Sequence, residues 1–425
     1  MTAYTVGSGQ TLTGLIVGPS DSVTVAAGGT IVRTVDAGGI DTLHGGIGID
    51  TTVFGGGREN VDAGGSARGS IIENNSSIIV TGNNFMSHAI IESGGNAYLS
   101  INDPSGSGNP TDSFTLINGG TESVGSFLGS GTALDDTVQD GGRQDVMAGL
   151  ARGTIINSGG MQTVFAQAIG TVVNGGGLQQ VTGGDGDFGR ATGSVLNAGA
   201  LQTIEHGSSQ HTLINKGGRE NVGGMGYADG TVINGGTLDL GQYGIALNSI
   251  QFTGRGGVLD IGSTATSTTT INGFVATDRI DLRGFGYSSK VSVSLGKDNV
   301  LTIKGLTGGT ARLLLDPKAS YAHKVFTLYQ DGHGGTNLIV QAVPSSKLAV
   351  PDLANLHADA TAAGDPLGLR ATFTAAATAV ASSVPASTRM MPDVTGGSTH
   401  AASTLAGAAS AAHIPLLTDH HVGMG

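Results

Sequence analysis

The sequence predicts an all-β chain, most of which winds into a parallel β-helix, or β-solenoid, of about 11 coils. Glycine contributes 75 of the 425 residues, and it recurs as Gly-Gly pairs rather than at every third position, which excludes collagen. Short aliphatic runs precede these pairs at regular intervals. Aromatic residues make up only 4% of the chain and Trp is absent, so a globular core built on large rings is disfavoured.

The repeat is a phrase of Thr or Ser, two aliphatic residues, often Asn, a variable residue, Gly-Gly, three mostly polar residues and then Val. Clear copies span residues 154–164 and 212–222. Successive pairs are most often 18 residues apart, and some intervals are longer. A constant interval with occasional lengthening is typical of stacked coils that extrude loops. The turn glycines of the clearest copies are Gly141, Gly142, Gly159, Gly160, Gly176, Gly177, Gly217, Gly218, Gly235 and Gly236.

Each part of the phrase has a physical reason. Short β-branched runs favour strands, and Gly-Gly permits the backbone angles of a tight corner. One corner per coil places equivalent residues about 4.8 Å apart, so that strands pair in parallel. The asparagines before the corners are candidates for a stacked, hydrogen-bonded ladder, and the favoured interpretation is that they only form turns. They are Asn118, Asn157, Asn174, Asn197, Asn215 and Asn234.

The period divides the chain into four parts. Residues 1–29 are expected to form an N-terminal cap or first coil, and residues 30–262 the solenoid. Residues 263–345 hold much of the aromatic content and are predicted to form a C-terminal β cap that covers the last strand edges. The low-complexity, Ala-rich residues 346–425 are expected to be either a disordered tail or an export signal. Within the solenoid, extruded loops are expected near residues 100–112, 125–136 and 183–193, as binding loops or as tolerated insertions.

Net charge and cysteine content exclude or disfavour several classes of function. The net charge of −12 and the lack of a Lys/Arg stripe disfavour nucleic-acid binding. The absence of Cys excludes disulfides and thiolate chemistry. No apolar window is long enough for a transmembrane helix, and no cleavable signal peptide is visible at the N-terminus.

We expect no catalytic residue, no cofactor and no metal, with one weak exception. Residues 45–50 match the start of a calcium-binding nonapeptide, which makes Asp50 a Ca²⁺ candidate. The pair Asp135-Asp136 and the motif Gly332-His333-Gly334 superficially resemble polygalacturonase motifs, but about 200 residues separate them. Acid–base catalysis needs carboxyl groups that converge on one bond, and no second acidic pair supplies that.

The phrase T-h-h-N-x-G-G-x-x-x-V at this spacing resembles the AIDA-type repeat of autotransporter adhesin passengers, over residues 1–260. The resemblance implies a right-handed β-helix at a bacterial cell surface, whose usual role is adhesion or cell–cell aggregation. The tail lacks the alternating, aromatic-girdled strands of an autotransporter β-barrel, so no translocator is expected in it.

Three functions remain open from the sequence. The first is a secreted or surface adhesin or biofilm protein that binds surface glycans, proteins or other copies of itself, with its tail as a candidate contact for export machinery. The second is a β-helical polysaccharide lyase or hydrolase. The third is a subunit of a filament or surface layer. The first is favoured because many weak polar contacts repeated along a rod add up by avidity.

Overall fold

The computed structural model describes residues 1–100, 108–126, 129–183, 188–262, 269–305 and 309–343. The chain divides into two units, Met1–Ser345 and Ser346–Gly425. The second unit, for which the sequence predicts either a disordered tail or an export signal, lies outside the described residues. The first unit is all-β, with a single short 3₁₀ turn, η1 (Lys297–Asn299), among its described residues.

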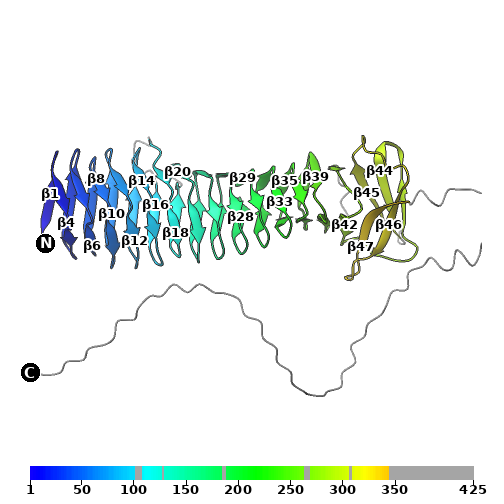
Figure 1. The fold of residues 1–425 in the computed structure, drawn as a ribbon, viewed down its shortest axis with the longest axis horizontal. Coiled ribbons are helices and arrows are strands. Elements are labelled where there is room, and N and C mark those ends of the chain that lie inside the picture. Colours follow the sequence, from blue (N-terminus) through cyan, green and yellow to red (C-terminus); the bar gives the residue numbers. More distant parts are fainter. Residues whose placement is uncertain (101–107, 127–128, 184–187, 263–268, 306–308, 344–425) are drawn as a thin grey trace, which may run out of the picture. The chain divides into compact units, whose positions relative to one another are not determined.

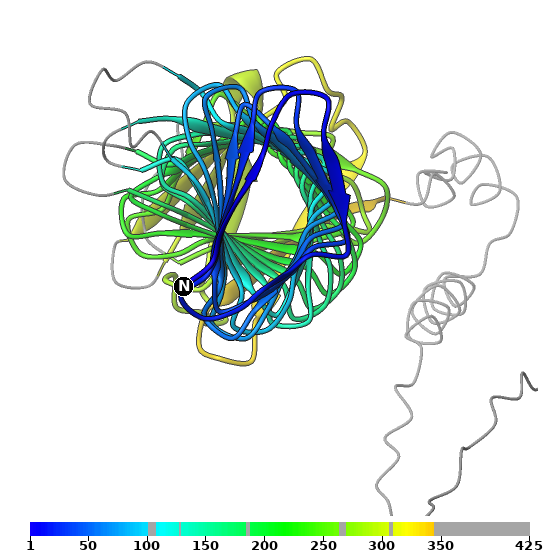
Figure 2. The ribbon, with the colours of Figure 1, turned by 90° about the vertical axis from the view of Figure 1, so that its left-hand side faces the viewer.

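The solenoid is built from coils of three short strands, one in each of three parallel sheets, and Figure 2 shows this cross-section end-on. We name the sheets A, B and C in the order in which each coil visits them. The fold class is therefore the predicted one. Stacked coils run from β1 to β42, and a smaller group of longer strands closes the C-terminal end (Figure 1).

The parallel strands of sheet A are β1 (Ala3–Val6), β4 (Ser22–Ala26), β7 (Ile40–His44), β10 (Arg58–Asp62), β13 (Ser77–Val80), β16 (Asn96–Leu99), β19 (Thr121–Val124), β22 (Arg143–Val146), β25 (Met161–Val164), β28 (Leu178–Thr182), β31 (Leu201–Glu205), β34 (Arg219–Gly223), β37 (Thr237–Leu240), β40 (Val258–Ile261) and β42 (Arg279–Leu282). Those of sheet B are β2 (Thr11–Thr13), β5 (Thr30–Val32), β8 (Ile47–Ile49), β11 (Ser66–Arg68), β14 (Phe85–Ser87), β17 (Thr111–Ser113), β20 (Gly131–Leu134), β23 (Gly149–Arg152), β26 (Gln167–Ile169), β29 (Arg190–Thr192), β32 (Ser208–Gln210), β35 (Tyr227–Asp229) and β38 (Ile245–Leu247). Those of sheet C are β3 (Ile16–Val17), β6 (Val35–Ala37), β9 (Thr52–Phe54), β12 (Ile71–Ile72), β15 (Ile90–Ile91), β18 (Leu116–Asn118), β21 (Thr137–Gln139), β24 (Ile155–Ile156), β27 (Val172–Val173), β30 (Val195–Leu196), β33 (Leu213–Asn215), β36 (Val232–Asn234), β39 (Ser249–Thr253) and β41 (Thr270–Asn272).

The described coils number about 14, so the predicted 11 is too low. The prediction counted Gly-Gly pairs from residue 38 to residue 236. The corner between β3 and β4 uses residues 18–21, with Ser20 in the left-handed conformation, and contains no Gly-Gly pair. Two more coils follow β37, through corners at residues 254–257 and 273–278. Parallel pairing thus begins inside the predicted cap 1–29 and continues past residue 262 as far as β42.

The two glycines of a corner meet different requirements. The first is in the left-handed region, as Gly159 with φ +76° illustrates. The second lies against the preceding coil, where a Cβ on Gly160 would come within 2.3 Å of the Val138 carbonyl oxygen. The first glycine is therefore required for its left-handed backbone conformation, and the second because any side chain there would clash with the preceding coil.

The cap is built on the last coil. β42 pairs antiparallel with β47 (Thr336–Ala342), which pairs with β46 (Lys324–Gln330). β41 pairs in parallel with β45 (Thr310–Leu315), and β43 (Ser292–Leu295), β44 (Val300–Lys304) and β45 form an antiparallel meander. The Arg283 guanidinium, just after β42, forms ion pairs with Asp239 and Asp260 on two preceding coils. The open edge of sheet A at this end is thus paired and charged, which protects it from edge-to-edge association.

Candidate functional site

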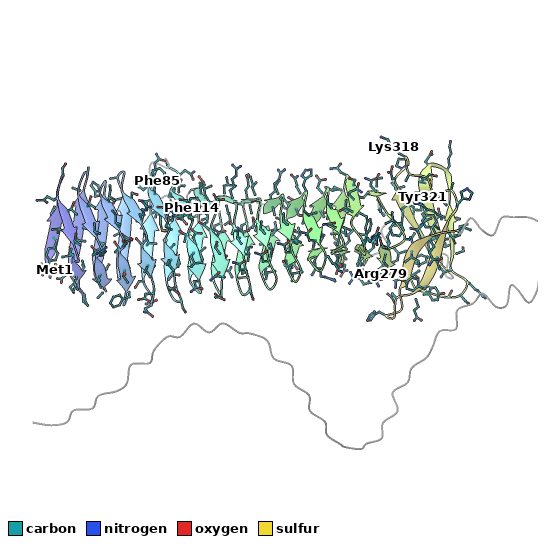
Figure 3. The ribbon with its side chains drawn as sticks, viewed as in Figure 1. Met1, Phe85, Phe114, Arg279, Lys318 and Tyr321 are labelled. Atoms are coloured by element: carbon teal, nitrogen blue, oxygen red, sulfur yellow. The ribbon has the colours of Figure 1, made fainter. Side chains whose placement is uncertain are left out.

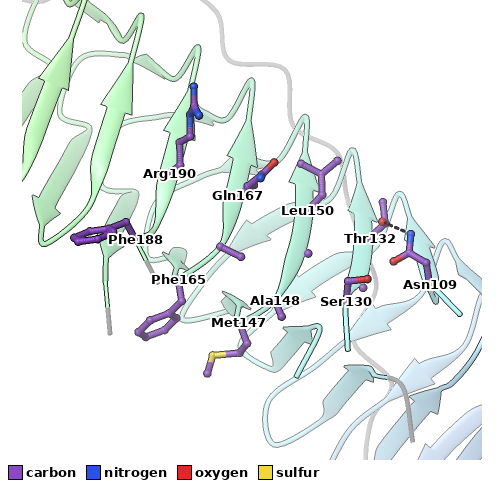
Figure 4. Close-up of a pocket in the computed structure, with 13 residues that line it drawn as sticks. Asn109, Ser130, Thr132, Met147, Ala148, Leu150, Phe165, Gln167, Phe188 and Arg190 are labelled. Atoms are coloured by element: carbon purple, nitrogen blue, oxygen red, sulfur yellow. Dashed lines mark hydrogen bonds between the residues drawn. The ribbon is translucent and has the colours of Figure 1, made fainter. Parts of the chain in front are cut away.

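A surface hollow lies where sheet A turns into sheet B in the middle coils. It has a volume of about 700 Å³. Figure 4 shows Met147, Phe165 and Phe188 gathered at one edge of it, next to the row Thr132, Leu150, Gln167 and Arg190 on the outer face of sheet B. Phe188 is 65% exposed. We call this hollow the corner groove.

The row is a direct consequence of register. Thr132 pairs with Leu150, Leu150 with Gln167, and Gln167 with Arg190, so that four coils present one side chain each at the same level. Described parts of the three predicted loops lie at the groove, since Asn109, Ser130 and Phe188 line it. The remaining loop residues 101–107, 127–128 and 184–187 lie outside the described residues.

The outer face of sheet B carries a charge opposite to that of the chain. Its described outward residues include Arg68, Arg152 and Arg190 but only one acidic residue, Asp229. Among the described residues that line the corner groove, Arg190 is the only charged one. In a protein of net charge −12, this face is therefore locally basic.

A second exposed aromatic group lies a few coils nearer the N-terminus. Phe85 and Phe114 are each 56% exposed, and Figure 3 shows them on neighbouring coils. The Phe114 ring contacts the His88 ring with a centroid distance of 5.3 Å. Exposed rings therefore occur repeatedly on and beside sheet B.

The predicted asparagines lie at one corner, beside the outer face of sheet C. Asn174 donates to Asn157 at 2.8 Å, Asn197 to Asn174 at 2.8 Å, Asn215 to Asn197 at 2.9 Å, and Asn234 to Asn215 at 2.9 Å. Asn118 does not join this run, because Gln139 occupies the intervening coil and the Asn118 amide instead donates to Glu92 Oε2 at 2.9 Å. Five of the six predicted residues thus form one continuous ladder.

The other singled-out residues do not converge. Asp50 lies at a left-handed position between sheets B and C, and it belongs to no group of three possible ligands among the described residues. Its Ca²⁺ site remains a prediction. Asp135 is exposed at an equivalent turn, whereas Asp136 is buried inside the solenoid. His333 lies in the loop between β46 and β47 of the cap.

Sequence reasoning missed a polar column inside the solenoid. Gln162 Nε2 donates to Gln144 Oε1 at 2.7 Å, and Gln179 Nε2 donates to Gln162 Oε1 at 2.8 Å. The hydroxyls of Thr154 and Thr171 add further hydrogen bonds to this column. We call it the glutamine spine. Its signal was present as Gln in the second position after Gly-Gly and as the Thr that opens each phrase.

Acidic residues continue the spine, and burial raises their pKa values. The pKa of Glu220 is raised to about 7 by burial, although Ser209 and Thr231 donate hydrogen bonds to its carboxyl group. Near the N-terminus, burial raises the pKa of Glu59 to about 7, and burial together with the charge of Glu59 raises that of Asp41 to about 8. These groups hold their protons at pH values where surface carboxyls have lost them.

The one described cluster of three acidic residues able to hold a cation is Asp112, Glu122 and Asp136, whose ligand oxygens lie within 4.8 Å of one another. Thr115 and Gln144 donate to four of the six oxygens, through Asp112 Oδ1, Glu122 Oε2 and both oxygens of Asp136. Only Asp112 Oδ2 and Glu122 Oε1 lack a partner. Ca²⁺ requires about six or more oxygen ligands, so the donor set does not fit it. Burial raises the pKa of all three groups, and retained protons satisfy the cluster instead.

The solved structures that the chain resembles include one whose description bears on function. The chain is similar to the crystal structure of a TibC-catalysed, hyper-glycosylated TibA fragment, with 27% identity and a TM-score of 0.56. The match covers 63% of this chain and 94% of that one. It supports an AIDA-type, adhesin-like β-solenoid built from repeats. No family model and no curated protein sequence matches the chain.

Nothing in the described part of the chain is a helix with the length and hydropathy needed to cross a bilayer.

Proposed function

We propose that this protein is a secreted or cell-surface adhesin that binds acidic polysaccharide along the outer face of sheet B, with the corner groove as its main site. The adhesin-like solenoid and the resemblance of its repeat to AIDA-type repeats support the role. The observation that carries the ligand class is the composition of the described groove lining: two phenylalanines and Met147 lie beside Arg190, the one charged residue among the described lining residues.

The chemistry of each lining residue suits a sugar acid. The apolar face of a pyranose packs on an aromatic ring, and Phe188 offers an exposed one. The Arg190 guanidinium presents several donors in a planar fork, which matches a carboxylate. Gln167 and Asn109 add amide groups able to bond sugar hydroxyls.

The repetition of coils is expected to strengthen binding through avidity. A single shallow site of this kind binds weakly, because few contacts are desolvated. A polymer that lies across successive coils meets exposed side chains about every 4.8 Å, so that its segments bind at high effective concentration. The strength of adhesion should then increase with the number of coils that the polymer contacts.

The test is affinity electrophoresis of the full chain in gels that contain alginate, a polyuronate, or dextran, a neutral glucan. We expect alginate to retard the protein and dextran to leave it unretarded. F188A and R190Q should each reduce retardation by about tenfold, since each removes about 1.4 kcal/mol or more. R58Q and Y98A, on the outer face of sheet A, serve as matched controls. Equal migration of the wild-type protein in both gels would exclude the proposed ligand.

A further inference from the structure

Two neighbouring coils near the N-terminus place carboxyl and hydroxyl groups together inside the solenoid. Asp41 on β7 and Glu59 on β10 pair in register, at the level that Gln144 of the glutamine spine holds in a later coil. Thr51 and Ser70 directly precede the paired strands β9 and β12 of the same two coils. All four side chains are fully buried. Each coil thus contributes one carboxyl group and one hydroxyl group to the interior.

These groups lack the hydrogen bonds that the equivalent groups form in later coils. There, the Thr154 hydroxyl donates to Gln144 Oε1 at 3.1 Å. Here, both oxygens of Asp41, both oxygens of Glu59 and the hydroxyl oxygens of Thr51 and Ser70 have no hydrogen-bond partner. Burial raises the pKa of Glu59, and the nearby hydroxyls of these two residues lower it in part. Six buried oxygens therefore lie close together without satisfying one another.

No basic side chain compensates for the two carboxyl groups. The buried residues in the described part of the chain include no Lys, Arg or His. Asp36 lies close to Asp41, and its oxygens already accept hydrogen bonds from the backbone amides of Gly39 and Arg58. It therefore adds negative charge to this interior and supplies no positive group. Because a buried carboxylate requires a compensating charge, this part of the solenoid favours a cation.

The spacing of the coils selects among cations. Equivalent atoms on neighbouring coils lie about 4.8 Å apart, so an ion midway between two of them is about 2.4 Å from each. That distance lies within the range of about 2.3–2.6 Å for bonds from Ca²⁺ to oxygen and exceeds the 2.0–2.1 Å of Mg²⁺. The six oxygens also meet the lower limit of the coordination number of Ca²⁺. Zn²⁺ is disfavoured because neither Cys nor His is present among the four residues.

A glycine keeps space open beside these oxygens. Gly48 is the inward residue of β8, in the same coil as Asp41, and its register partner in the next coil is Ala67. A Cβ on Gly48 would come within 2.9 Å of Glu59 Oε1. Any side chain at this position would therefore press on the carboxyl group and narrow the space available to an ion.

We propose that one Ca²⁺ ion binds inside the solenoid between the third and fourth coils, with Asp41, Thr51, Glu59 and Ser70 as its ligands. The two carboxylates balance the charge of the ion, and the ion joins the two coils. Without the ion the carboxyl groups retain protons, because burial raises the pKa of both, and binding displaces these protons. The site is separate from Asp50 and does not depend on the saccharide site, because it lies inside the solenoid.

Metal analysis after refolding tests the site. The full chain is unfolded in denaturant with a chelator, refolded at pH 8 with about 1 mM CaCl₂ or MgCl₂, and dialysed against metal-free buffer before the retained metal is measured. We expect one Ca²⁺ per chain and at least about tenfold less Mg²⁺, because the coils enclose an ion of the right size as they form. D41N/E59Q should retain no Ca²⁺, and its amides can pair as in the glutamine spine. D50N, the matched control at the exposed candidate, should retain the ion.

A second variant and a local measurement keep the test independent of the folding of D41N/E59Q. T51V/S70A removes two ligands and no charge, so it should release Ca²⁺ during dialysis at least about tenfold faster than the wild type. In the wild type, Ca²⁺ should slow amide hydrogen exchange in β7 and β10 about tenfold and leave exchange in β31 unchanged. F188A should behave as the wild type in both measurements, so that failure of the saccharide site is distinguished from failure of the ion site.

Several results would overturn the proposal. They are a wild-type chain that retains no Ca²⁺, a D41N/E59Q variant that retains as much as the wild type, and equal retention of Mg²⁺. Loss of the ion in D50N would assign it to the Asp50 turn instead. Protection from hydrogen exchange that appears only outside β7 and β10 would contradict the location.

Discussion

Gln179 Nε2 donates a hydrogen bond of 2.8 Å to Gln162 Oε1 one coil away, inside the solenoid and out of reach of solvent. The two side chains occupy the same place in successive repeats. Each amide acts as donor to one coil and acceptor to the next, so the spine is satisfied without water. Where a carboxyl group takes this place, the pattern of donors and acceptors fails unless the group is protonated.

Replacing Glu220 with Gln should therefore extend the glutamine spine from Gln202 by one coil. At pH 8 we expect E220Q to raise the free energy of unfolding by about 1–3 kcal/mol, because the variant removes a buried charge. At pH 4, where the wild-type carboxyl is already neutral, the difference should vanish. Denaturant unfolding at both pH values measures it, with E205Q, an exposed position on the outer face of sheet A, as control.

Stability should fall as pH rises from 5 to 8. The pKa of Asp41 is raised to about 8 and that of Glu59 to about 7, so in this window the folded chain binds more protons than the unfolded chain. The stabilisation is complete below the unfolded pKa near 4 and is lost as pH passes through the folded values. We expect a loss of about 2–4 kcal/mol in unfolding experiments. The double variant D41N/E59Q should make the profile less steep, while Glu220 and the Asp112 cluster keep a residual slope. An equally steep profile in that variant would contradict this assignment.

Two glycine substitutions distinguish the cost of a steric clash from the cost of a left-handed backbone conformation. In G160A the new Cβ would meet the Val138 carbonyl at 2.3 Å, so the backbone must move, at a cost of about 3 kcal/mol or more. In G170A the position has φ +69° but nothing within 4 Å, so only the left-handed strain of about 1 kcal/mol is expected. Melting temperatures of the two variants measure both losses, and we expect the larger decrease in G160A. A larger loss in G170A would mean that the corners are not packed coil on coil.

Breaking the asparagine ladder in its middle should cost less than breaking the spine. N174A leaves Asn157 Oδ1 and the Asn197 amide without partners, but both are half-buried, so water compensates in part. We expect about 1 kcal/mol for N174A and more than 2 kcal/mol for Q162A, which also leaves a buried cavity. Comparable losses in the two variants would indicate that the ladder is less accessible to water than its exposure suggests.

The sequence predicted the features that repeat with the coil. Regular glycine pairs were enough to predict parallel stacking, whereas the ladder from Asn157 to Asn234 was the less favoured of two interpretations. The three-strand cross-section was not evident, because sheet B has no signature beyond small inward residues such as Ala168 and Ala191. Which of two adjacent aliphatic residues faces the core also depends on strand register, so the sequence did not show that Ile155 points outward and Ile156 inward.

The corner groove could not be predicted from the sequence. It arises where loops of unequal length leave neighbouring coils, and its residues Asn109, Phe165 and Phe188 are far apart in the chain. Only the irregular intervals between Gly-Gly pairs pointed to that region. The buried carboxyls were missed for another reason: a polar residue in a strand of alternating pattern is normally assigned to the solvent face.

The stacking of coils, on which the corner groove and the glutamine spine both depend, is tested most directly by distances between spin labels on sheet A. Thr24 and Ser123 are five strand steps apart, and Thr24 and Thr203 nine. Double electron–electron resonance on T24C/S123C and T24C/T203C should give about 24 Å and about 43 Å, following the number of coils at about 4.8 Å each. Two similar distances, or a shorter one for the second pair, would contradict the parallel solenoid.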